Sequence, residues 1–218
     1  MSPIITAFAQ SLDGGKGLAR DMRVRWALEE VSQPYNVRLV TFGQMKEPAH
    51  LAVQPFGQIP SFEDGEVALF ESGAIVLHLA ERHPGLMPIE VAARGRILAW
   101  FFAALNTVEP PIVELEQAYF TAGQKAWYPE LRAVLVERVR YRLDQLAAYL
   151  GDAEWLDGRF SAADLMMVMV LRRLDGEEIL QSYPKLLAYV ARGTARPAYQ
   201  RAYAEQRQVF ERVQAAGS

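Results

Sequence analysis

The fold is decided by the segment Gln58-Ile59-Pro60-Ser61-Phe62-Glu63-Asp64-Gly65-Glu66-Val67-Ala68-Leu69-Phe70-Glu71-Ser72-Gly73. Its first three residues close a loop, and Ile59-Pro60 is an X-Pro bond of the kind that can be cis. The next ten residues read as two short strands around a turn at Asp64-Gly65. Glu71-Ser72 then opens a helix. The segment therefore predicts a β-hairpin that leads directly into a helix.

The start of that helix has the features of a binding site for a charged ligand. The first N–H groups of a helix lack intrahelical partners and lie at the positive end of its dipole, so an anionic group can bind there. The carboxylate of Glu71 can pair with an ammonium group. A cis Ile59-Pro60 bond would turn a backbone edge outward for an extended peptide. Together these features suit the zwitterionic amino-acid end of a ligand.

The residues around this segment predict the rest of a small α/β domain. A buried strand, a helix with apolar positions on one face and an alternating strand precede the hairpin, and a helix follows it. These elements are expected at residues 4–9, 22–31, 36–41 and 72–82, with an irregular or shortly helical stretch at 46–55. The order β-α-β followed by β-β-α is that of a thioredoxin-like fold.

The second part of the chain has helical patterns and no convincing strand. Residues 91–121 look helical with an interruption near Pro110-Pro111, and residues 130–150 repeat apolar positions at helical spacing. Ser161 and Asp164 form a capping-box pattern before a run that is apolar on all faces, which is typical of a central bundle helix. Two more helices are expected to open at Tyr183-Pro184 and Arg196-Pro197.

Proline and glycine punctuate the chain between these parts. Pro84, Gly85 and Pro88 mark residues 84–90 as a linker. We therefore expect an α/β domain at residues 1–83 and an all-helical domain at residues 91–218.

Composition excludes several function classes. A net charge of −3 gives no basic field for nucleic acid or an anionic membrane. The longest apolar run, Leu165 to Leu171, is too short to span a bilayer. The absence of cysteine excludes disulfides, a catalytic cysteine and a CxxC redox pair. The three histidines lack metal-ligand spacing, so no metal is expected. No charged and apolar leader precedes the first strand, so a cytoplasmic protein is expected.

Nearly the whole chain resembles the cytosolic glutathione transferases. The resemblance rests on Gln54-Pro55-Phe56-Gly57-Gln58-Ile59-Pro60, on Glu71-Ser72-Gly73-Ala74-Ile75 and on the Phe160–Leu165 capping segment, in that order and spacing. It implies an α/β plus all-α fold, in which a thioredoxin-like N-terminal domain precedes an all-helical C-terminal domain. It also implies glutathione as co-substrate, a small hydrophobic electrophile as second substrate, and a homodimer.

The resemblance further implies roles for matching residues. Ile59, with Pro60 cis, would hydrogen-bond the cysteinyl backbone of glutathione through its main chain. Glu71 and Ser72 would hold the γ-glutamyl amino and carboxylate groups, and Gln58 is placed to reach the glycyl end. In the family the first helices of the second domain line the electrophile pocket. There, Asn106 and Tyr119 are the polar candidates.

The catalytic position is ambiguous in this chain. The family's Tyr, Ser or Cys follows the first strand, close to the start of the first helix. Counted forward from the strand, Ser11 fills that place and resembles the serine-type, theta- or zeta-like bacterial members. Counted backward from the first helix, the place falls near Leu18-Ala19, which carry no hydroxyl.

Ser11 is nevertheless the predicted catalytic residue, because it is the only hydroxyl residue between strand and helix. A hydroxyl that donates to sulfur stabilises the thiolate. The rival is a backbone N–H of the loop or helix start, with Lys16 or Arg20 supplying positive charge.

These residues predict a transferase that conjugates the glutathione thiolate to a hydrophobic electrophile, as in detoxification. Glutathione-dependent isomerase, dehalogenase and peroxidase activities share the thiolate step and are variants of the same hypothesis. The alternative is a non-catalytic glutathione-transferase-like binding or scaffold protein. Uncertainty over the catalytic position favours that alternative, whereas the Ile59-Pro60 and Glu71-Ser72 pattern favours retained glutathione binding.

Overall fold

The computed structural model describes residues 2–216, which form two compact units. The N-terminal unit holds the described residues up to 88 together with those from 195 on, and the helical unit holds residues 89–194. The first boundary lies within the predicted linker of residues 84–90. The division differs from the predicted one at the end of the chain, because the last helix groups with the N-terminal unit and not with the helical one.

The N-terminal unit is built on a four-stranded mixed sheet in the order β2-β1-β3-β4. The strands are β1 (Ile4–Phe8), β2 (Asn36–Val40), β3 (Ser61–Glu63) and β4 (Ala68–Phe70). β1 pairs parallel with β2 and antiparallel with β3, and β3 pairs antiparallel with β4. This topology confirms the predicted thioredoxin-like fold.

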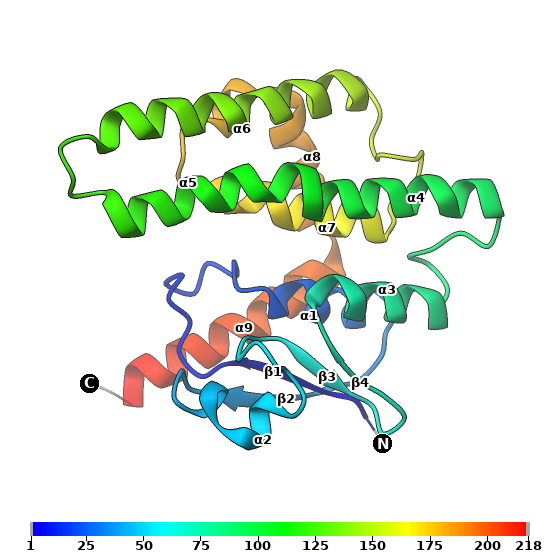
Figure 1. Ribbon diagram of the computed structural model, residues 1–218. Helices are drawn as coiled ribbons and strands as arrows, with labels where there is room; N and C mark the ends of the chain where they lie inside the picture. The colour runs from blue at the N-terminus through cyan, green and yellow to red at the C-terminus, as the bar shows by residue number, and fades with distance from the viewer. Residues whose placement is uncertain (1, 217–218) are drawn as a thin grey trace. The chain divides into compact units, whose positions relative to one another are not determined.

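Helices cover both faces of this sheet. They are α1 (Asp21–Glu30), α2 (Pro48–Leu51), α3 (Ser72–Arg82) and α9 (Pro197–Ala216), with a 3-10 turn, η1, at Gln44–Lys46. α1 and α3 lie along one face, and the short α2 lies on the other (Figure 1).

The grouping of α9 with this unit has a clear physical cause. Arg196, just before α9, places its guanidinium on the Glu30 carboxylate at 2.6 and 2.8 Å. Tyr199 meets Trp26 of α1 edge-on, with ring centroids 5.0 Å apart. α9 therefore runs along α1 and not along the helices that precede it in sequence (Figure 1).

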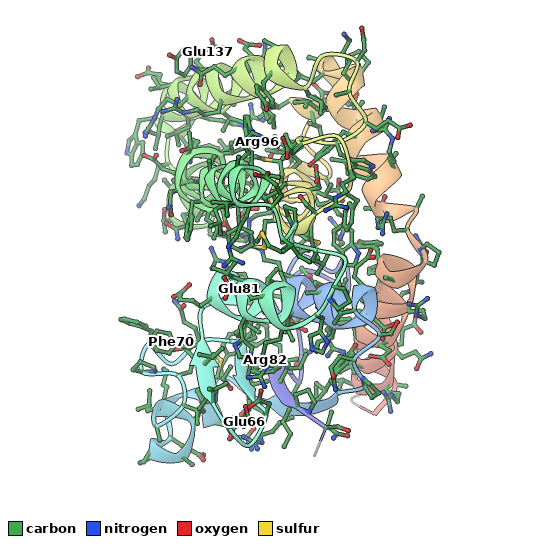
Figure 2. All side chains as sticks on the ribbon, turned by 90° about the vertical axis from the view of Figure 1, so that its right-hand side faces the viewer. Glu66, Phe70, Glu81, Arg82, Arg96 and Glu137 are labelled. Carbon is green, nitrogen blue, oxygen red and sulfur yellow. The ribbon has the colours of Figure 1, made fainter. Side chains whose placement is uncertain are left out.

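The hairpin turn is held by Asp64. Its Oδ1 accepts from the backbone N–H groups of Glu66 and Val67, both at 3.0 Å. Gly65 has φ +89°, a conformation that glycine adopts without a Cβ penalty. The exposed ion pair from Arg82 to Glu66, at 3.0 Å, ties the turn to the end of α3 (Figure 2).

The helical unit, described throughout, contains helices and no strand. Its α-helices are α4 (Val91–Ala103), α5 (Glu109–Ala122), α6 (Tyr128–Leu150), α7 (Ala162–Leu171) and α8 (Pro184–Thr194), and η3 (Arg172–Leu174) and η4 (Leu180–Ser182) are 3-10 turns. The expected interruption near Pro110-Pro111 is a π-helical turn, η2 (Ala104–Val108), between α4 and α5. The two prolines then stand in the first turn of α5, and because proline has no backbone N–H they cannot donate to the preceding turn. Within residues 2–216, no helix combines the length and apolar character that crossing a bilayer requires.

The centre of the helical unit is α7, whose residues are all buried. The predicted capping box is present: Asp164 accepts from the N–H (3.0 Å) and hydroxyl (2.8 Å) of Ser161. Asp164 also accepts from the Leu156 N–H and the Tyr189 hydroxyl, each at 2.9 Å. Burial raises the pKa of Asp164 above its ordinary value in spite of these donors. One carboxylate thus joins α7, α8 and the chain before α7.

We expect Asp164→Ala to destabilise the protein by about 3 kcal/mol or more, because it leaves several buried donors without an acceptor. Ser161→Ala, which removes one cap hydroxyl, should cost only about 1 kcal/mol. Denaturant unfolding monitored by circular dichroism measures both. Equal effects of the two substitutions would show that the contacts to Leu156 and Tyr189 add nothing.

Candidate functional site

Strand pairing sets the position of the candidate site. Ser61 of β3 lies opposite Phe70 of β4, so Pro60 and Glu71 stand at the same end of the hairpin. The Ile59-Pro60 peptide bond is cis. The two halves of the predicted motif therefore lie next to each other, although ten residues separate them in sequence.

The loop before Pro60 is fixed from inside. The buried His50 bonds through Nε2 to the Gln58 carbonyl oxygen at 2.7 Å, and the Gln54 side chain accepts from the Phe56 N–H at 2.8 Å. Gly57 has φ +60°, and a Cβ there would lie 3.1 Å from the Met45 carbonyl oxygen. The loop thus has one well-supported course, and it leaves the Gln58 side chain exposed.

Ile59 turns its side chain inward. It is buried in a cluster with Val40 and Met45, and Phe8 and Ala19 pack against that cluster. A ligand at this loop therefore meets the main chain of Ile59 and not its side chain. Ala19, two residues before α1, packs against the same cluster that buries the Ile59 side chain.

The start of α3 presents a carboxylate and a hydroxyl in different settings. Glu71 is exposed and has φ +68°, a left-handed conformation that non-glycine residues rarely adopt. Ser72 is only 3% exposed, and its Oγ accepts from Nη1 of Arg23 at 3.3 Å. Arg23, on α1, is itself 2% exposed. A buried cation therefore lies directly behind the Ser72 hydroxyl. The left-handed backbone of Glu71 is strained, and strained residues cluster at ligand sites.

Asp13 organises the loop between β1 and α1. Its Oδ1 accepts from the Ser11 hydroxyl at 2.7 Å and from the Gly15 N–H at 3.0 Å. Its Oδ2 accepts from the N–H groups of Leu18 at 2.6 Å and Ala19 at 3.3 Å. This carboxylate therefore links the predicted catalytic serine to the two residues that the alternative count had singled out.

α9 packs against the outer side of the same loop. The Tyr203 hydroxyl donates to the Gly15 carbonyl oxygen at 3.2 Å. A Cβ at Gly15 would lie 2.8 Å from the Phe210 ring, and one at Gly17 would lie 2.8 Å from the Tyr203 ring. The close approach of α9 therefore favours glycine at positions 15 and 17.

Ser11 lines a small pocket between the loop and α9, together with Phe8, Ala9, Asp21, Arg25, Gln206, Val209 and Phe210. Its hydroxyl faces Asp13, and Ala19 packs against the cluster that contains Ile59. The catalytic role of Ser11 stays a prediction.

Asn106 and Tyr119 are not brought together. Asn106 is exposed in η2, and Tyr119 is exposed near the end of α5, where its ring contacts Phe120 and Tyr128. With a rise of about 1.5 Å per residue, the two stand about 20 Å apart along the helix. One small electrophile cannot contact both.

No metal centre is found in residues 2–216: nowhere there do three or more His, Cys, Asp or Glu side chains gather as a metal would need.

Comparison with known proteins identifies the family. The model of the glutathione S-transferase N-terminal domain matches residues 14–81. Glutathione S-transferase 1 of Zea mays is 31% identical over 196 residues, covering 82% of this chain and 88% of that protein. The glutathione S-transferase-like protein gedE of Aspergillus terreus is 30% identical over 212 residues, covering 84% and 89%. The chain belongs to the glutathione S-transferase family.

Other glutathione S-transferases match over different lengths. Glutathione S-transferase F9 of Arabidopsis thaliana is 32% identical, and the match spans 60% of that relative and 56% of this chain. A glutathione transferase family member from Pseudomonas fluorescens, solved with two glutathione bound, is 26% identical with a TM-score of 0.79 over 92% of each chain. One from Burkholderia graminis, also with two glutathione molecules per subunit, is 25% identical with a TM-score of 0.80, covering 92% of this chain and 87% of that one. Relatives thus come from plants, fungi and bacteria, and they do not establish a glutathione S-transferase class.

Several residues that build this site were not predicted from sequence. Arg23 bonds Ser72 and His50 bonds the Gln58 carbonyl oxygen. Asp13 holds the loop between β1 and α1. An Asp followed by two glycines is a loop-capping pattern, so Asp13 had a recognisable signal. Arg23 and His50 had none, because their roles depend on tertiary packing.

Gly17→Ala should destabilise the protein more than Gly14→Ala. Both glycines have positive φ, near +70°, but a Cβ at Gly14 meets nothing within 4 Å, whereas one at Gly17 meets Tyr203. The shared backbone penalty is about 1–2 kcal/mol, and the clash should add about 1–3 kcal/mol for Gly17 alone. Thermal unfolding of the two variants measures the difference, and equal melting temperatures would show that α9 does not press on the loop.

Proposed function

We propose that this chain is a glutathione transferase that binds glutathione at the hairpin end and adds its thiolate to a small hydrophobic electrophile. The observation that carries the proposal is the Ser61–Phe70 pairing, which joins the cis Ile59-Pro60 loop to Glu71 and Ser72. Glutathione is an extended peptide with a zwitterionic γ-glutamyl end. A backbone edge beside a charged helix start suits both of these features.

The start of α3 would hold the γ-glutamyl group. Because the Ser72 hydroxyl accepts from Arg23, its own proton is available to the glutamyl carboxylate. The buried Arg23 guanidinium and the first N–H groups of α3 add positive potential there. The exposed Glu71 carboxylate would take the ammonium group in a charge-assisted hydrogen bond.

The remainder of glutathione would run along the cis-proline loop. The cysteinyl backbone would bond the main chain of Ile59, and the exposed Gln58 amide would reach the glycyl end. The thiol then comes near the start of α1, where Ala19 packs against the Ile59 cluster. Ser11 would stabilise the thiolate by turning its hydroxyl proton from Asp13 to sulfur.

The reaction itself needs no nucleophile from the protein. The thiol loses its proton to solvent, and a sulfur lone pair forms the new carbon–sulfur bond. The electrophile releases the displaced electron pair with a leaving group or, on addition to a double bond, takes up a proton. An isomerase, dehalogenase or peroxidase would use the same thiolate. The homodimer, the cytoplasmic location, the theta- or zeta-like class and an electrophile contact by either Asn106 or Tyr119, but not by both, stay predictions.

A glutathione-binding scaffold is the second candidate, and a specific observation favours it. The single proton of Ser11 and the N–H groups of Leu18 and Ala19 are all donated to Asp13. A thiol there finds its nearest donors already engaged. Glutathione binding without turnover against a panel of electrophiles would support the scaffold and contradict the transferase.

Glu71→Ala should weaken glutathione binding by about 1.5–3 kcal/mol, or roughly 10- to 150-fold in Kd, because it removes a charged hydrogen bond. Glu66→Ala is the matched control, since Glu66 is an exposed glutamate at the opposite end of the same hairpin. Isothermal titration calorimetry measures both, and circular dichroism checks the fold. An unchanged Kd for a folded Glu71→Ala protein would remove Glu71 from the site.

Ser11→Ala should lower turnover and raise the pH at which bound glutathione ionises, while leaving its Kd nearly unchanged. A hydroxyl stabilises the thiolate more than the thiol, so its loss acts on ionisation and not on binding. The ultraviolet absorbance of the thiolate, followed against pH, measures the effect. If the ionisation does not move, a backbone N–H activates the thiol and Ser11 is a loop residue.

A further inference from the structure

We propose that Asp13 is a positioning residue that holds the Ser11 hydroxyl and the Leu18 and Ala19 amides just before α1, and thereby limits how readily the bound thiol ionises. The inference rests on the proposed function, since it concerns the thiol that the hairpin site would bind. It assigns a role to a residue outside the motif.

Asp13 accepts hydrogen bonds from groups that could otherwise donate to the sulfur. A serine hydroxyl carries one proton, and that of Ser11 is donated to Asp13 Oδ1 at 2.7 Å. The Leu18 and Ala19 N–H groups, at 2.6 and 3.3 Å, are donated to Asp13 Oδ2. Asp13 therefore already holds the hydroxyl and two of the backbone N–H groups that could otherwise stabilise the thiolate.

The Asp13 carboxylate also lies close to the proposed thiol site. Asp13 Oδ2 lies 3.3 Å from the nitrogen of Ala19, and Ala19 packs against the buried cluster that contains Ile59. The carboxylate therefore bonds a residue that packs against the same buried cluster as the loop on which the cysteinyl group would bind. A negative charge at that distance opposes the formation of a second one.

The loop that carries Asp13 is held in place by α9. The Asp13 loop does not swing freely, because Tyr203 bonds the Gly15 carbonyl oxygen and the Phe210 ring closes over Gly15. Release of the Ser11 proton therefore requires a rotation of the hydroxyl and not a movement of the whole loop. Asp13 and sulfur compete for one proton within a fixed frame.

The other charged groups around this loop do not replace Asp13. Asp21 and Arg25 of α1 pair with each other at 2.8 Å and are buried. On α9, Arg207 pairs with Glu211 at 2.7 Å, and Glu205 lies 3.6 Å from Arg25. Lys16 and Arg20 on the loop carry positive charge and act in the opposite direction to Asp13.

The decisive substitution is Asp13→Asn, which keeps the shape of the side chain and removes its charge. We expect the thiolate fraction of bound glutathione at neutral pH to rise by about tenfold. Asp64→Asn is the matched control, because Asp64 also caps a loop through two backbone N–H groups but stands at the far end of the hairpin. A thiolate fraction that is unchanged in Asp13→Asn, or raised equally by both substitutions, overturns the inference.

The double variant Asp13→Asn/Ser11→Ala tests whether Asp13 acts on the thiol through the Ser11 hydroxyl or through its charge alone. If Asp13 acts by holding the hydroxyl, most of the gain from Asp13→Asn disappears when Ser11 is absent. A gain that persists in full without Ser11 means that charge alone acts, and it contradicts the positioning of the hydroxyl.

A final measurement requires no glutathione. Hydrogen exchange of the Gly15, Leu18 and Ala19 amides should accelerate at least tenfold in Asp13→Ala, while the Glu66 and Val67 amides stay protected. Unchanged exchange contradicts the positioning role whatever the ligand. If the wild-type protein binds no glutathione, the proposed function and the thiol part of the inference both fail. Glutathione binding with unmoved ionisation in Asp13→Asn contradicts the inference alone.

Discussion

The antiparallel pairing of β3 with β4 is the constraint on which the candidate site depends. The opposition of Ser61 and Phe70 fixes Pro60 and Glu71 at one end of the hairpin. A slip of one residue would exchange the two faces of each strand and separate the loop from the helix start. Thr6 of β1 reinforces the register, because its Oγ1 accepts from the Ser61 N–H at 2.7 Å. The arrangement of the candidate binding residues is thus a consequence of sheet geometry.

In the proposed function, binding and activation of the thiol fall to different parts of the N-terminal unit. The hairpin and α3 supply the groups suited to recognition, and the loop between β1 and α1 supplies those suited to ionisation. That loop is fixed by Asp13 on one side and by α9 on the other. Because α9 comes from the end of the chain, the loop's geometry depends on residues far away in sequence.

Sequence patterns predicted the local features of this fold well. The strand and helix order of the N-terminal unit, the Asp64-Gly65 turn and the capping box at Ser161 all follow from nearby residues. The grouping of α9 with the N-terminal unit was not predicted, because it rests on Arg196–Glu30 and Tyr199–Trp26 contacts between distant segments. The candidate site likewise combines residues that a local motif predicts with residues that only tertiary packing brings in. Glu71 and Ser72 belong to a recognisable motif, whereas the Arg23 behind Ser72 and the donors held by Asp13 emerge only in three dimensions.

A crystal structure with glutathione bound would test the central claim most directly. The account predicts the γ-glutamyl group on Glu71 and Ser72, the cysteinyl backbone on Ile59 and the sulfur within about 3.5 Å of the Ser11 hydroxyl. It also predicts that the hydroxyl has turned away from Asp13 while the loop keeps its course. Glutathione bound away from the hairpin end, or sulfur beside Ala19 with the Ser11–Asp13 bond intact, would contradict it.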